Sequence, residues 1–227
     1  MVRPKKEQQN RDLREEIKRT ARKQMAEIGA ATLSLRAIAR DLKITAPAIY
    51  NYFSNRDDLV TALIVDAYNS LSKYLIASQM TDEESHVERI LASARAYRNW
   101  ALNHPEEYSL IFGTPIPNYH APMEITGPAA ASAMGALIDT LDAAWQAGVL
   151  QTNKVFSSPP EMIVEWIKRF DYKGDPAVIH FAMMSWSQIH GIVSLELNGH
   201  YSSFPKVISV DSFFEIEIQA SIKRMTI

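Results

Sequence analysis

Two short helical patterns joined by a tight turn occupy residues 34–52, and they constrain the fold more than any other stretch. Ser34 is a favourable helix cap, and apolar residues then recur at three- and four-residue spacing up to Leu42. A second pattern opens with Thr45 as its side-chain cap and Pro47 in its first turn, where a missing N–H costs little. Two short helices joined by a turn of three or four residues form a helix-turn-helix, so the sequence predicts one here.

The second helix of this pair has side chains that suit a nucleic-acid groove. Residues 46–48 are small and would let the helix approach a groove floor closely, and residues 50–52 offer hydroxyl and amide groups for phosphates and base edges. Spacing alone leaves another interpretation open, because any small helical domain can contain two amphipathic helices and a turn.

The residues that follow favour DNA binding. After Phe53, Asn55 is placed to cap a third helix whose first turn holds two acids. The stretch LRAIARDLKITAPAIYNYFSNRDDLVTAL, residues 35–63, resembles without gaps the N-terminal DNA-binding domain of the TetR family of transcriptional regulators. One position departs from that pattern, because Lys43 stands where the family usually has Gly. A left-handed backbone would cost a non-Gly residue roughly 1 kcal/mol, so we expect a slightly different turn.

Charge is distributed unevenly along the 227 residues, whose net charge is −2. Residues 1–60 hold 13 Lys or Arg against 8 Asp or Glu, a net charge of +5, which leaves −7 for the remainder. A basic module joined to an acidic body is expected where one end meets phosphates, although a solvated charged face would look similar. The basic, polar N-terminus and the lack of a long apolar run predict a cytoplasmic protein without membrane spans.

Helical periodicity continues along the rest of the chain, and no segment alternates convincingly with period two, so we predict an all-α fold. An apolar stripe at Leu13, Ile17, Ala21, Met25 and Ile28 predicts a first helix that ends at Gly29. We expect a long connecting helix from Asn55, with a domain boundary near Ala77 that separates residues 1–77 from 78–227. Further helices are predicted from the capping box at 81–84, over 106–113, from Ala129 to Gly148, over 161–170, from the Asp175-Pro176 start to Gly199, and from an Asp211 cap. The proline-rich stretch 114–128 is predicted to be irregular and to form a wall or lid of a pocket.

The second half resembles the effector domain of one branch of the same family, through Trp186, His190-Gly191, Glu196 with Gly199, and residues 104–119. This resemblance implies a homodimer whose last two helices pair as a four-helix bundle, and a ligand cavity inside each subunit. Gly191 adds an argument of its own, because a glycine inside a helix costs roughly 1 kcal/mol and usually permits a close backbone contact. The expected interface residues are Trp186, His190, Gly191, Phe214 and Ile218.

The candidate site residues fall into two further groups. For DNA, the resemblance implies phosphate contacts by Ser34, Tyr50, Tyr52 and Arg56, a cation at Lys43, and base contacts near Arg36, Thr45, Ala46, Pro47 and Asn51. For an apolar ligand, the candidates are Tyr97, Trp100, Tyr108, Phe112, Tyr119, Met134, Trp145, Phe181 and Met184, although ordinary core packing is the commoner role for any single one of them.

Motifs for catalysis do not stand out in the sequence. It has no cysteine, no pair of histidines at helical ligand spacing, no Gly-rich phosphate loop and no G-x-S-x-G elbow, so we expect no enzyme, metal or cofactor. We therefore predict a ligand-responsive regulator, a repressor that binds a palindromic operator as a homodimer and is released by a small apolar effector. The alternatives are a DNA-organising or protein-interaction factor of the same fold without an effector and, more distantly, a helical-bundle enzyme.

Overall fold

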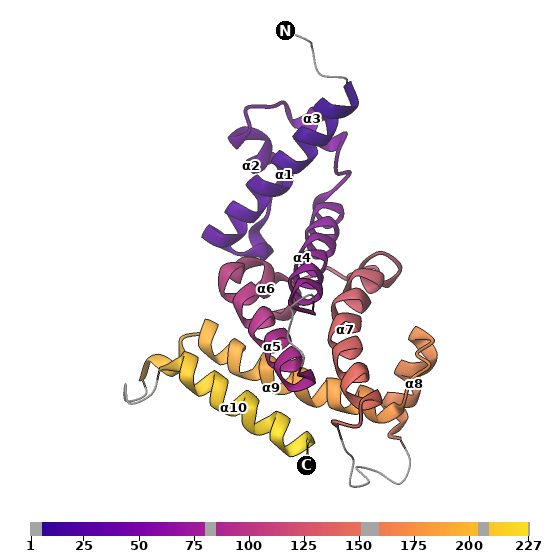
Figure 1. Cartoon of the computed structure of the whole chain (residues 1–227). Helices are drawn as coiled ribbons and strands as arrows, with labels where there is room; N and C mark the ends of the chain where they lie inside the picture. Colours follow the sequence, from indigo (N-terminus) through magenta and orange to yellow (C-terminus); the bar gives the residue numbers. More distant parts are fainter. Residues whose placement is uncertain (1–5, 80–84, 151–158, 204–208, 227) are drawn as a thin grey trace. The chain divides into compact units, whose positions relative to one another are not determined.

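The computed structural model describes residues 6–79, 85–150, 159–203 and 209–226, and every regular element in these ranges is helical, which confirms the all-α prediction (Figure 1). The α-helices are α1 (Lys6–Ile28), α2 (Leu35–Asp41), α3 (Ala46–Tyr50), α4 (Arg56–Gln79), α5 (His86–Asn103), α6 (Pro105–Phe112), α7 (Met123–Gln146), α8 (Glu161–Phe170), α9 (Pro176–Leu197) and α10 (Val210–Met225). Short 3-10 turns follow α1 and α9, at Ala30–Thr32 and His200–Ser203.

The chain folds into two compact units, and each contains two separate stretches of sequence. Unit 1 comprises Met1–Tyr68 and His104–Ala129, and unit 2 comprises Asn69–Asn103 and Ala130–Ile227. Helices α4 and α7 each contribute residues to both units. The domain boundary expected near Ala77 remains a prediction.

The core of unit 1 is built from one apolar face of each of its first four helices. Ile17 of α1, Ile38 of α2, Ile49 of α3 and Leu59 of α4 are all fully buried in one cluster. Full burial of such side chains contributes about 1.5–3 kcal/mol each, so these four residues fix how the short helices pack. The predicted stripe on α1 is correct except at its end, where Ile28 is 57% exposed.

Helix α6 and the loop after it also belong to unit 1. Leu110, Ile111, Ile116 and Tyr119 pack against the core cluster of the first four helices. The Tyr119 hydroxyl lies 2.9 Å from the hydroxyl of Thr61 on α4. Residues 114–122 are irregular as predicted, and the structure places Ile116 and Tyr119 on the core of unit 1.

The irregular stretch ends earlier than predicted, because α7 begins at Met123 and contains Pro128 in its interior. The carbonyl of Pro122 accepts hydrogen bonds from the N–H groups of Ile125 and Thr126, which starts the helix. A proline inside a helix removes one backbone hydrogen-bond donor, and in this 24-residue helix the other backbone hydrogen bonds keep the helix continuous past Pro128. The prediction that residues 123–128 are irregular is therefore wrong.

Unit 2 is centred on α5, α9 and α10. Trp100 of α5, Ile179 and Val193 of α9, and Phe214 of α10 are buried. Helix α8 packs on α9 and buries Ile163. The predicted helix over 161–170 is confirmed.

Two of the helix starts in unit 2 can be compared with their predictions. The Asp175 carboxylate accepts from the Ala177 N–H at 2.8 Å, which confirms this cap. The last helix is instead capped by Ser209, which accepts from the Ser212 N–H, and Asp211 lies in its first turn. The predicted capping box at 81–84 lies outside the described residues. No helix within the described ranges is long and apolar enough to cross a membrane.

Candidate nucleic-acid interface

A left-handed residue closes the turn between α2 and α3. Lys43 has φ 54°, its N–H donates to the Arg40 carbonyl, and the Ile44 N–H donates to the Ala39 carbonyl. These two hydrogen bonds form a Schellman motif, which usually has glycine at the left-handed position. The expectation that Lys43 would alter the turn is wrong: lysine adopts the glycine-like conformation, and the turn keeps its geometry.

Helix α3 is short and is held by one side chain. Ile49 is fully buried, whereas Ala46, Pro47 and Tyr50 are exposed. Because a five-residue helix has little stability of its own, its packing through Ile49 and the turn before it define its position. The face opposite Ile49 is therefore free to enter a groove.

The caps of α2 and α3 differ. The Ser34 hydroxyl accepts from the Ala37 N–H at 3.4 Å, as predicted. Thr45 occupies the cap position of α3 but makes no side-chain cap hydrogen bond, which corrects that prediction. Its exposed hydroxyl is thus not used by the helix, and this suits a contact outside the chain.

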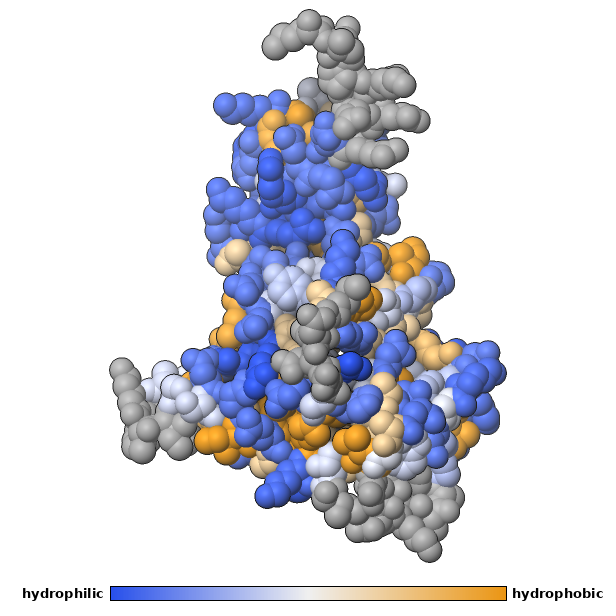
Figure 2. Space-filling model, viewed as in Figure 1, coloured by the Kyte–Doolittle hydropathy of each residue, from blue (hydrophilic) through white to orange (hydrophobic). Residues whose placement is uncertain are grey.

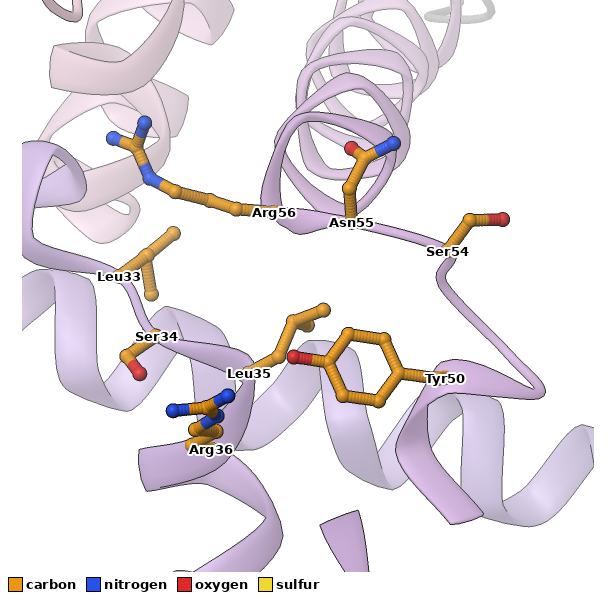
Figure 3. A pocket seen from close by; sticks show the side chains of 8 residues that line it. All are labelled: Leu33, Ser34, Leu35, Arg36, Tyr50, Ser54, Asn55 and Arg56. Atoms are coloured by element: carbon orange, nitrogen blue, oxygen red, sulfur yellow. The ribbon is translucent and has the colours of Figure 1, made fainter. Parts of the chain in front are cut away.

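A hollow of about 330 Å³ lies beside the start of α2, the end of α3 and the start of α4. Its lining residues are Leu33, Ser34, Leu35, Arg36, Tyr50, Ser54, Asn55 and Arg56. Figure 3 shows the Tyr50 hydroxyl pointing across the hollow toward the first turn of α2, whereas Ser54 points away. A guanidinium, a phenol and a serine hydroxyl around one concave site suit an oxyanion such as a backbone phosphate.

Arg56 is occupied within the fold. Its guanidinium donates hydrogen bonds to the carbonyls of Ala30 and Ala31, at 3.2 and 3.0 Å. Arg56 thereby ties the start of α4 to the connection before α2, so its predicted phosphate contact competes with a structural role. Sequence reasoning missed this role, because neither carbonyl is identifiable from residue types.

Helix α1 supports the end of α3. The Arg14 guanidinium donates to the Tyr52 carbonyl at 3.0 Å and lies 4.4 Å from the ring centre of Phe53. Sequence analysis also overlooked Arg40, which is exposed on α2 four residues after Arg36. Spacing of four residues on a helix would have placed the two arginines on one face.

The residues predicted for ligand binding are divided between the two units. In unit 1, Tyr108 packs on Phe112, and Tyr119 contacts Thr61. In unit 2, Trp100 and Phe181 are buried, and Met184 is exposed. The remaining candidates of unit 2 are Tyr97, which is buried, and Met134 and Trp145, which are half-buried.

A shallow groove in unit 2 lies between α8 and α9 and has a volume of about 520 Å³. It is lined by Pro160, Met162, Ile163, His180, Met183, Met184, Ser187 and Gln188, of which the sequence analysis had named Met184 alone. Burial lowers the pKa of His180, so its ring favours the neutral form. The described residues contain no group of three or more His, Cys, Asp or Glu able to hold a metal ion.

The predicted interface residues occupy different environments. Phe214 and Ile218 are buried within the chain, and Trp186 is half-buried, with its ring centre 5.3 Å from that of His190. The Nδ1 atom of His190 lies 2.9 Å from the Tyr97 hydroxyl, and burial lowers its pKa. A Cβ atom added at Gly191 would meet no described atom within 4 Å outside its own helix backbone and chain neighbours.

Comparison with known proteins agrees with this geometry. Residues 17–63 match the family described as bacterial regulatory proteins, tetR family, and residues 90–221 match the family described as tetracyclin repressor-like, C-terminal domain. The HTH-type transcriptional regulator Rv1816 of Mycobacterium tuberculosis is 38% identical over 200 residues, which cover 85% of this chain and 86% of that protein. A regulator of the same description from Mycobacterium bovis, Mb1846, has the same identity and coverage.

Solved structures share the whole architecture. The crystal structure of the regulatory protein SCO4313 aligns with a TM-score of 0.79 and 33% identity, and the match covers 97% of this chain and 100% of that one. A TetR family regulator from Marinobacter aquaeolei aligns with a TM-score of 0.65 over 97% and 98% of the chains, and its 15% identity shows the fold alone. With both halves of the sequence matched and a helix-turn-helix in place, this chain belongs to the TetR family of DNA-binding transcriptional regulators.

Proposed function

We propose that this protein is a cytoplasmic repressor that binds a near-palindromic operator as a homodimer and leaves it when a small apolar effector binds. The observation that carries the DNA-binding part is the α2–turn–α3 geometry, in which Ile49 anchors α3 and leaves its opposite face exposed. The small residues Ala46 and Pro47 at the start of α3 would lie deepest in the major groove.

The proposed contacts divide into two classes. Arg36, Asn51 and Thr45 are exposed and lie nearest the bases, while Tyr50, Ser34 and Lys43 contact phosphates around the hollow and the turn. Tyr52 and Arg56 act mainly by holding α3 and α4 in place. The Tyr52 carbonyl accepts a hydrogen bond from Arg14 of α1, and the Arg56 guanidinium donates to the carbonyls of Ala30 and Ala31.

The proposed dimer interface lies on α9 and α10, which contact each other within the subunit. Gly191 and Leu195 are four residues apart and therefore share one face of α9, and the Leu195 side chain is exposed. Phe213 and Ile216 are exposed on α10, and in Figure 2 orange patches lie over α9 and α10. Exposed apolar patches of this kind mark interaction surfaces, whereas Phe214 and Ile218 support them from inside.

The effector would act by shifting populations. It must bind more tightly to a dimer whose two α3 helices no longer match one helical turn of DNA, roughly 34–36 Å. The groove between α8 and α9 is within the size range of small-molecule sites and is lined mainly by apolar side chains. If no apolar compound both raises the melting temperature and changes the DNA affinity, the alternative of a regulator without an effector is favoured.

The operator hypothesis is tested by selection from a randomised 30-bp duplex library with the full-length protein. We expect enrichment of an inverted repeat, and we expect Asn51→Ala to change which bases are enriched because the amide reads a base edge. Asn99→Ala is the matched control, since Asn99 is equally exposed but lies on α5. Equal affinity of the wild type for selected and scrambled duplexes at physiological salt would refute sequence-specific binding.

A further inference from the structure

A relay of charged side chains of alternating sign, Glu107–Arg22–Asp66, connects three helices of unit 1. Glu107 Oε1 of α6 lies 2.8 Å from Arg22 Nε of α1, and Arg22 Nη2 lies 2.7 Å from Asp66 Oδ2 of α4. Lys18, one helical turn before Arg22, reaches the same Asp66 oxygen at 2.8 Å. Arg22 of α1 therefore pairs with a carboxylate of α6 and with one of α4, whereas Lys18 pairs with Asp66 and with Glu15 of its own helix.

The relay is poorly accessible to water, so its charges depend on one another. The side chains of Glu107 and Lys18 are each 9% exposed, and those of Arg22 and Asp66 are each 26% exposed. Two buried atoms of the pair, Glu107 Oε2 and Arg22 Nε, make no hydrogen bond with the described residues, so the 2.8 Å contact between Arg22 Nε and Glu107 Oε1 is an ion pair without hydrogen-bond alignment. His104 Nδ1 lies 3.6 Å from Glu107 Oε2. A buried carboxylate that loses its cation is strongly unfavourable, which makes the Glu107–Arg22 pair resistant to being pulled apart.

Helix α1 also contacts the helix-turn-helix of α2 and α3 at two points. Two residues after Arg22, the Gln24 side chain donates to Asp41 Oδ2 at 2.8 Å, in the last turn of α2. Eight residues before Arg22, Arg14 donates to the Tyr52 carbonyl just after α3. A shift of α1 would therefore move both ends of the helix-turn-helix.

From these contacts we propose that Glu107 is a positioning residue for DNA binding. It lies far beyond the helix-turn-helix in sequence, and it acts through Arg22 by fixing α1 against α4, which in turn orients α2 and α3. This assignment goes beyond the proposed function, which names contacts on the DNA face alone, and it rests on the family's DNA binding.

The test compares Glu107→Gln with Glu106→Gln in the full-length protein. Both changes remove one negative charge from the first turn of α6, but Glu106 makes no ion pair with the described residues. We measure the affinity for the duplex selected by the wild type at 10 °C, where each variant is verified as folded by far-UV circular dichroism, and we measure the melting temperature separately. Glu107→Gln should weaken binding about tenfold at that temperature and Glu106→Gln less than about twofold.

A purely stabilising role gives a different result. If Glu107→Gln lowers the melting temperature but leaves the affinity at 10 °C unchanged, or changes neither, the proposal is overturned. A variant with both Glu107→Gln and Arg22→Lys should bind no more weakly than Arg22→Lys alone, because the two residues act through one contact. Additive losses would also overturn it. If Glu107→Gln does not fold, Glu107→Asp against Glu106→Asp provides the same comparison, because a shortened side chain at position 107 draws the carboxylate away from Arg22.

Wild-type binding separates this proposal from the operator hypothesis. Failure of the wild type to select any duplex would reject the operator hypothesis, and the variants are then compared on a random-sequence 30-bp duplex at low salt. Equal affinities there would reject the positioning role of Glu107.

Discussion

The turn between α2 and α3 depends on the backbone of one residue, Lys43. Its left-handed conformation is fixed by two hydrogen bonds that satisfy carbonyls at the end of α2. A residue with a Cβ atom is strained in the left-handed region, so packing of the surrounding core must offset the free-energy cost of this conformation at Lys43. The lysine places an exposed cation three residues before α3.

Lys43→Gly should raise the free energy of unfolding by roughly 0.5–1 kcal/mol, because glycine adopts this conformation without steric cost. Lys43→Ala keeps the strain and removes the cation, so it should leave stability nearly unchanged. Both variants should make the salt dependence of DNA binding shallower by about one ion if Lys43 contacts a phosphate. Chemical denaturation and anisotropy titrations at several salt concentrations check both effects, and a less stable Lys43→Gly would contradict the strain.

Single residues also show where sequence reasoning stops. The caps at Ser34, Asn55 and Asp175 were predicted correctly, because a cap bonds to its own helix, whereas those at Thr45 and Asp211 were wrong, because several nearby residues can cap a helix and spacing does not choose among them. The structural role of Arg56 was missed, since its partners are the backbone carbonyls of Ala30 and Ala31, some 25 residues earlier in the chain, and its phosphate contact stays a prediction. Partners of long side chains are set by tertiary packing, which residue spacing does not contain.

At the scale of helices, Arg98 of α5 joins the two helices proposed for dimerisation. Its guanidinium makes two hydrogen bonds to Glu196 of α9, at 2.7 and 2.6 Å, and an ion pair with Asp211 of α10 at 2.7 Å. These hydrogen bonds and the neighbouring charges raise the pKa of Arg98, so it stays protonated. The Arg98 side chain is 11% exposed and that of Glu196 is 16% exposed.

Arg98→Ala should lower the free energy of unfolding by up to about 3 kcal/mol, because it leaves the half-buried Glu196 carboxylate without its cation. Arg95→Ala is the control on the same helix: Arg95 pairs with Glu215 of α10, but its side chain is 41% exposed, so the loss should stay below about 1 kcal/mol. Urea denaturation of both variants gives the comparison. Equal losses of unfolding free energy in the two variants would show that burial does not determine how much each ion pair stabilises the fold.

Helix existence was predicted better than helix boundaries. The helices over 161–170 and from Asp175 to Gly199 follow from caps, proline positions and strong periodicity. The start of α7 was placed at Ala129 because Pro128 was treated as a breaker, yet one missing N–H is tolerated inside a 24-residue helix. Whether a proline ends a helix depends on the packing of the turns before it, which sequence alone does not reveal.

At the scale of the whole molecule, the oligomeric state of a Gly191 variant gives a direct test of the proposed dimer interface. Gly191→Leu should leave the subunit folded, since no described atom outside its own helix crowds that position. It should nevertheless raise the dimer dissociation constant about 10- to 100-fold, because the added side chain enters the interface from both subunits. Gly135→Leu is the control, as Gly135 is also a helical glycine with no close neighbour. Sedimentation velocity reports the outcome, and a Gly191→Leu dimer of normal affinity would move the interface elsewhere.

The candidate ligand residues were the least predictable group. Aromatic and Met residues at helical spacing were all assigned to one cavity, but the structure divides them between two units, with Tyr108 and Tyr119 in unit 1 and Trp100 and Phe181 in unit 2. Periodicity shows that a side chain is buried and does not show which core receives it. The DNA-binding residues were easier to place, because they lie within one short continuous stretch.

Helix α6 and the loop after it make the DNA-binding half of this protein a module in two pieces of sequence. Consider a chimera that joins the first 68 residues to the body of another regulator at a single junction. It would lose the packing of Leu110 on the core of the first four helices and would replace Glu107, the partner of Arg22, by a residue of the other regulator. Residues 104–129 would have to be transplanted as well, through a second and third junction. Exchange of DNA specificity between relatives should therefore succeed more readily by replacing exposed residues of α3 than by exchanging whole N-terminal segments.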